Sequence, residues 1–171
     1  MLKVKNKLVL KELARKKFME TILDFLMKDH RKFNKILSEV EELSKDLNRE
    51  LLSPEQKFKV MKDVVFIIHE VSVFAGMFED HKELEEITVF KVLEKRGLVS
   101  ETRKLKEDHA LITNLLRDLE KEFSEFRERT KPLEESAAAI LKIFLNICTI
   151  IRKHMKQEER IFKNLKSSTL S

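Results

Sequence analysis

Two pairs of residues in this sequence have the spacing of metal ligands on a helix. His81 is followed four residues later by Glu85, and His154 is followed four residues later by Glu158. A helix turns by about 100° and rises by about 1.5 Å per residue, so a step of four leaves both side chains on one face. Each pair can therefore present an imidazole nitrogen and a carboxylate oxygen to one site. Iron, manganese and zinc all accept these donors.

Hydrophobic residues recur along the chain at alternating spacings of three and four, a pattern that we call the seam. It is typical of a helix that packs lengthwise in a bundle. Four of the five histidines stand in the seam, namely His30, His81, His109 and His154. The fifth, His69, falls off the seam, and we expect it to point away from the core.

Placing these imidazoles and carboxylates in an apolar seam without partners costs free energy, because buried charges lose their hydration. Metal ions compensate for that loss. Six ligands exceed the needs of one metal and suit two, with each carboxylate bridging the pair. A lone seam histidine is more typical of a hydrogen-bonded core residue, so the prediction requires all four to lie at one level. The predicted metal ligands are His30, His81, Glu85, His109, His154 and Glu158.

Helix-capping residues and prolines divide the chain into four long segments. The run Ser53–Gln56 has the pattern of a capping box with a proline at the first helical position. Gly97 is predicted to cap the C-terminus of the second helix, and Ser100 is predicted to cap the N-terminus of the third. The last helix is predicted to begin at Pro132. Residues 1–13 either extend the first helix or form a separate basic arm. The predicted helices span residues 14–48, 54–95, 100–129 and 132–165.

Each predicted helix carries a seam, which predicts an all-α fold: an antiparallel up-down four-helix bundle. In the second helix the seam is predicted to continue past Glu85 through Thr88 and Val92. We expect residues 1–171 to form one domain, whose bundle core covers about residues 14–165.

The composition excludes several classes of protein. Two glycines cannot supply a dinucleotide-binding or phosphate-binding loop, and one cysteine excludes a disulfide framework and a cysteine-based zinc cluster. The first 17 residues lack the continuous apolar region of a signal peptide, so we expect a cytoplasmic protein. The most apolar stretch, Ala137–Ile151, is interrupted by Lys142, so we expect no membrane span. The net charge of +5 is modest, and no nucleic-acid partner is expected.

Four segments of the sequence resemble the hemerythrin-like, or HHE cation-binding, family. They are Phe25–His30, His81–Gly97, Lys106–His109 and His154–Glu159, and the resemblance covers about residues 20–165. It implies a four-helix bundle with a non-haem di-iron centre that binds, senses or processes oxygen or nitric oxide. It also implies that the four seam histidines are terminal ligands and that the two seam glutamates are bridging ligands.

Three positions depart from the family pattern, and one of them is Lys91, which stands where a proline often follows the phenylalanine of the second helix. Thr113 stands where oxygen-carrying hemerythrins have a fifth histidine, and Lys82 stands where many members have a second histidine. An iron pair held by the remaining ligands would be more open, which favours reaction or sensing over simple reversible oxygen carriage. The leading hypothesis is a di-iron protein that binds or senses oxygen or nitric oxide at an open iron position. The alternatives are a di-iron redox enzyme acting on peroxide, oxygen or nitric oxide, and a metal-free helical interaction protein. Two iron ions are the expected cofactor, with manganese or zinc as substitutes, and the oligomeric state is not predicted.

Overall fold

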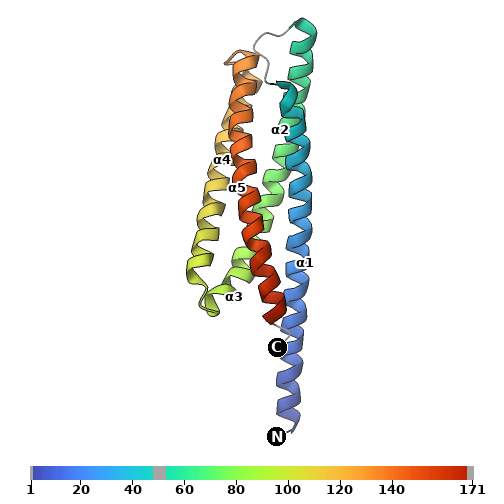
Figure 1. Cartoon of the computed structure of the whole chain (residues 1–171), viewed down its shortest axis with the longest axis vertical. Coiled ribbons are helices and arrows are strands. Elements are labelled where there is room, and N and C mark those ends of the chain that lie inside the picture. The colour runs from blue at the N-terminus through green and yellow to red at the C-terminus, as the bar shows by residue number, and fades with distance from the viewer. Residues whose placement is uncertain (1, 48–52, 169–171) are drawn as a thin grey trace.

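The computed structural model describes residues 2–47 and 53–168, and in these ranges the chain forms helices and no strands. The elements are α1 (Leu2–Leu47), α2 (Pro54–Leu84), the π-helical turn η1 (Glu85–Val89), α3 (Phe90–Lys95), α4 (Val99–Glu128) and α5 (Leu133–Ser168). The predicted all-α four-helix bundle is confirmed. The consecutive elements α2, η1 and α3 together make the second helical segment of the bundle, and α1, α4 and α5 make the other three (Figure 1). None of the described helices has a stretch long and apolar enough to cross a bilayer.

The ends of the first two helices follow from their local sequence. α1 already begins at Leu2, so residues 2–13 extend the first helix and do not form a separate arm. The predicted capping box at the start of α2 is present. The Gln56 N–H donates to Ser53 Oγ at 3.3 Å, and the Ser53 N–H donates to Gln56 Oε1 at 2.7 Å. These bonds satisfy backbone donors that the first turn of a helix leaves free.

The turn between α3 and α4 depends on Gly97, as predicted. Its φ of 83° lies in the left-handed region, and the following Leu98 N–H donates to the Leu93 carbonyl at 3.0 Å. This is a typical glycine C-cap. The turn is so short that α4 begins at Val99. The prediction that Ser100 caps this helix is therefore wrong, because Ser100 lies within its first turn.

The core consists of two hydrophobic clusters separated by a polar layer. The larger cluster joins the C-terminal half of α1 and most of α2 to α4 and α5, and includes Phe33, Phe74, Phe78, Ile112, Phe144 and Ile151. The smaller cluster joins the middle of α1 to α3 and to the C-terminal end of α5, and includes Leu26, Val89, Phe90, Leu105 and Phe162. Along every helix, the seam histidine falls between a residue of one cluster and a residue of the other. The predicted ligands therefore lie at one level of the bundle.

The π-helical turn corrects the predicted seam of the second helix. After Glu85 the buried residues are Val89, Phe90 and Leu93, whereas the predicted Thr88 and Val92 are only partly buried. A π turn holds one more residue than an α turn, so it moves the seam by one position. A constant helical period cannot predict that shift. The same turn begins at Glu85, one of the predicted ligands.

Two glycines allow a matched test of the turn. A β-carbon added at Gly97 or at Gly76 would meet no atom within 4 Å, but only Gly97 has a positive φ. We expect Gly97→Ala to lower the free energy of unfolding by about 1 kcal/mol because of its backbone conformation. Gly76→Ala, inside α2, should raise it by about 0.5–1 kcal/mol. Urea unfolding of both variants checks this, and equal effects would contradict the role of Gly97.

Candidate metal centre

The structure brings all six predicted ligand side chains together inside the bundle. One histidine comes from α1 and one from α4, while α2 with η1 and α5 each contribute a histidine and a glutamate. Each side chain is at most 2% exposed. His69, predicted to point away from the core, is 71% exposed. The six side chains are His30, His81, Glu85, His109, His154 and Glu158.

These side chains form two overlapping groups that share both carboxylates. The first group contains His30 and His81, and the second contains His109 and His154. Within each group, one donor atom of every residue lies within 4.8 Å of the others. The spacing suits one cation in each group, with both carboxylates available to each cation.

Each glutamate faces one histidine of each group through a different oxygen. In Glu85, Oε1 lies 3.4 Å from His81 Nε2 and Oε2 lies 3.3 Å from His109 Nε2. In Glu158, Oε2 lies 3.2 Å from His30 Nε2 and Oε1 lies 2.8 Å from His154 Nε2. A carboxylate in this orientation can bridge two metal ions.

The other ring nitrogen of every seam histidine faces a second carboxylate. The Nδ1 atom of His109 lies 3.0 Å from Glu86, and that of His154 lies 3.5 Å from Asp108. In the first group the distances are longer: 3.6 Å from His30 Nδ1 to Glu159 and 3.8 Å from His81 Nδ1 to Asp29. We call these four residues the outer carboxylates. An Nδ1–H that faces a carboxylate leaves Nε2 free to bind a metal.

Sequence reasoning missed the outer carboxylates, because it considered only residues that lie in the seam. The signal was a repeated doublet. An aspartate directly precedes His30 and His109, and a second glutamate directly follows Glu85 and Glu158. The residue beside each of these ligands thus faces the outer nitrogen of a histidine on another helix.

Most of the oxygen and nitrogen atoms that face the inside of this layer receive no hydrogen bond. Among the described residues, both oxygens of Glu85, both oxygens of Glu158 and the Nε2 atoms of His109 and His154 are buried and lack a hydrogen-bond partner. The Nε2 atoms of His30 and His81 lie 3.3 Å apart. Buried polar groups normally have partners. A pair of cations fits this layer, because it would satisfy lone pairs that no protein donor reaches.

The pKa values show the electrostatic conflict in this layer. Burial and the charge of Glu158 raise the pKa of Glu85 well above its ordinary value. Burial also opposes ionisation of Glu158, but the charge of His154 and the close approach of the His30 and His109 Nε2 atoms lower its pKa well below that value. Burial lowers the pKa of His81 to about 4. A bound cation would displace protons that otherwise relieve this conflict.

The comparison with protein families agrees with this geometry. Residues 21–165 match the family model of the hemerythrin HHE cation binding domain. The chain belongs to this family. A search of curated proteins and a search of solved structures each found no match. The hemerythrin-like centre is thus a candidate metal site on the grounds of both its family and its buried donors.

Two of the three departures from the family pattern, Lys82 and Thr113, are in contact in this hemerythrin-like domain. Lys82 Nζ donates to Thr113 Oγ1 at 3.2 Å, and the Thr113 hydroxyl donates to Glu79 at 3.0 Å. Both residues line a pocket of about 380 Å³ that also reaches His109. A lysine ammonium has no lone pair for a metal. These positions therefore supply a polar network beside the centre in place of imidazole ligands.

The 3.0 Å contact between Glu86 and His109 Nδ1 allows a test of whether an outer carboxylate orients its histidine ring. We expect Glu86→Ala to weaken binding of Mn²⁺ by about tenfold to a hundredfold, because the His109 ring loses its Nδ1 partner. Competition with a chromophoric chelator measures the affinity. Glu83→Ala is the matched control, because Glu83 is exposed on the preceding turn. Equal affinities of the two variants would contradict an orienting role for Glu86.

The shared carboxylates give a second test. Glu85→Ala and Glu158→Ala should each lose at least one metal ion per chain, because each removes a ligand from both groups. The rise in melting temperature on adding metal should shrink accordingly. Metal analysis and thermal unfolding check both effects. His69→Ala should keep its metal, and unchanged metal content in both glutamate variants would contradict the bridging role.

Proposed function

We propose that this protein is a non-haem di-iron protein that binds or senses oxygen or nitric oxide at an open iron position. The observation that supports it best is the orientation of Glu85 and Glu158, whose two oxygens face histidines of different groups. Each metal would have four protein donors. Iron accepts more ligands than that, so positions stay open for a small molecule.

The donor chemistry supports iron as the metal. Imidazole and carboxylate without thiolate suit iron, and manganese and zinc are the alternatives. When bound, an iron pair supplies electrons and open coordination positions to a diatomic molecule. The chain itself would hold the pair through the six ligands, and Glu86 and Asp108 would orient the rings of His109 and His154.

Aromatic rings that surround the histidines support a small, weakly polar ligand. Phe90 stacks on His109 with ring centroids 5.4 Å apart, and Phe162 stacks on His30 at 6.0 Å. Phe33 and His81 meet in a T-shaped arrangement with ring centroids 5.1 Å apart. These side chains exclude water from the layer. Oxygen and nitric oxide lose little hydration on entering such surroundings, whereas charged ligands lose much.

A di-iron redox enzyme acting on peroxide, oxygen or nitric oxide is the second candidate. The pocket beside His109 favours it, because Lys82, Lys106 and Thr113 give that pocket a polar lining. Such a lining suits a substrate that forms hydrogen bonds, such as peroxide. Binding and turnover are distinguished by whether the ligand is recovered unchanged.

The first experiment is metal analysis of protein purified without oxygen, followed by absorption spectra before and after air is admitted. We expect two irons per chain and a charge-transfer band that appears in air and disappears on deoxygenation. Irreversible oxidation of the centre would favour the enzyme. No bound metal after reconstitution with iron would contradict both candidates and leave a helical interaction protein. Apo-protein reconstituted with zinc is the control, because it should show no such band.

A further inference from the structure

The net charge of the chain is confined to its first 20 residues. Seven of the 35 Lys and Arg residues and two of the 30 Asp and Glu residues lie there. This leaves 28 basic and 28 acidic residues in positions 21–171. The whole excess of +5 therefore belongs to one segment, and the remainder of the chain is balanced.

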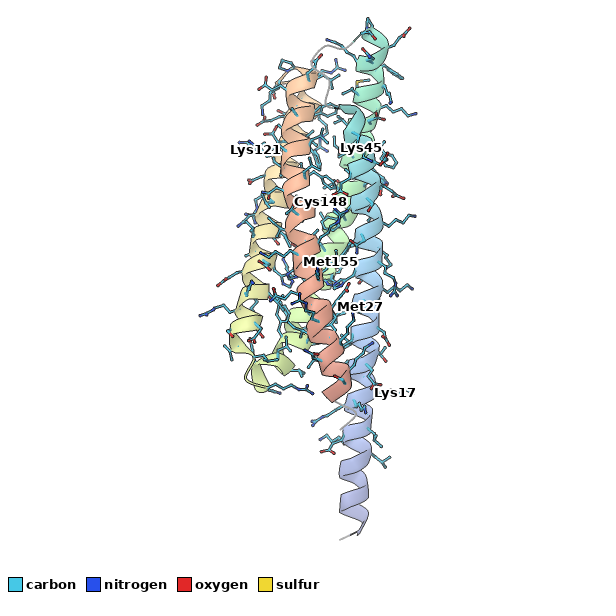
Figure 2. The ribbon with its side chains drawn as sticks, in the orientation of Figure 1. Lys17, Met27, Lys45, Lys121, Cys148 and Met155 are labelled. Carbon is cyan, nitrogen blue, oxygen red and sulfur yellow. The ribbon has the colours of Figure 1, made fainter. Side chains whose placement is uncertain are left out.

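This segment runs past the end of the bundle. The last turns of α5 reach α1 at Asp24, which pairs with Lys166. Lys17 lies near the level at which α5 ends, and the helix continues beyond it toward its N-terminus (Figures 1 and 2). The hydrophobic clusters of the described chain include no residue of α1 before Met19. We call Leu2–Phe18 the overhang.

The overhang exposes large apolar side chains along one side. Leu10, Leu13 and Phe18 are 67%, 56% and 64% exposed. At about 100° per residue, these three fall in an arc of about 140°, and Lys11 and Arg15 lie outside it. Lys17 falls within the arc, where its aliphatic stem can lie along an apolar surface while its ammonium reaches outward. The overhang is thus a basic amphipathic helix whose apolar side stays mostly exposed, although Arg15 and Phe18 border a groove beside Val92 of α3.

We propose that the overhang docks on the surface of a lipid bilayer that contains anionic headgroups. Such a surface accepts the leucine and phenylalanine side chains at the acyl boundary and attracts the cations. A second copy of this chain is a poor partner, because its overhang carries the same charge and its bundle is neutral. Nucleic acid would attract the cations but would leave the exposed apolar side chains in water.

Co-sedimentation of the full chain with vesicles tests this proposal. The protein should bind phosphatidylcholine vesicles that contain phosphatidylglycerol and should not bind vesicles of phosphatidylcholine alone. We expect Phe18→Asn to weaken binding roughly tenfold through lost apolar burial. The double variant Lys11→Gln, Arg15→Gln should weaken it by a similar factor through lost attraction to the headgroups. All these side chains are at the surface, so circular dichroism and the melting temperature should stay unchanged.

The matched control is Phe66→Asn, which removes an exposed phenylalanine from α2 and should bind vesicles like the parent chain. Three results would overturn the proposal: no binding to the anionic vesicles, equal loss in the Phe66 control, or full affinity in Phe18→Asn. A DNA duplex is titrated in parallel. Tighter binding to the duplex than to the vesicles, independent of Phe18, would assign the overhang to nucleic acid instead.

Discussion

The structure depends on one constraint: six ionisable side chains occupy a single buried layer. Two hydrophobic clusters enclose this layer, so water cannot satisfy its carboxylate oxygens and inward-facing nitrogens. Protons can relieve the repulsion between Glu85 and Glu158 only in part, because both carboxylates are fully buried. A pair of cations would satisfy both carboxylates and all four imidazoles at once. Metal binding at this layer would therefore be linked to its folding.

The layer is built from two similar halves of the chain. Each half supplies an Asp-His doublet on one helix and a His-x-x-x-Glu-Glu run on the next. The outer contacts Asp29 to His81 and Asp108 to His154 stay within a half. Those from Glu86 to His109 and from Glu159 to the α1 histidine cross between halves. Neither half can orient all of its histidines alone, so the centre requires the complete bundle.

Most of the fold and the inward half of the site could be predicted from the sequence. The seam selects residues that face the core, and it therefore found all six buried donors. It could not find the outer carboxylates, because they contact the histidines from outside the seam. The predicted seam is also wrong beyond Glu85, because the π turn places Val89 in the core where the seam had predicted Thr88. A one-residue change in helical period leaves no signal in a pattern that assumes a constant period.

The two groups are alike in composition but not in how firmly their histidines are held. In the second group the Nδ1 contacts are 3.0 Å and 3.5 Å, within hydrogen-bond range for His109 and weak for His154. In the first group, at 3.6 Å and 3.8 Å, the contacts are too long for hydrogen bonds. The rings of His30 and His81 are therefore held by packing against Phe162 and Phe33 and by the 3.3 Å contact between their Nε2 atoms. Because packing restrains a ring less directionally than a hydrogen bond, the first group can adjust more readily when coordination changes.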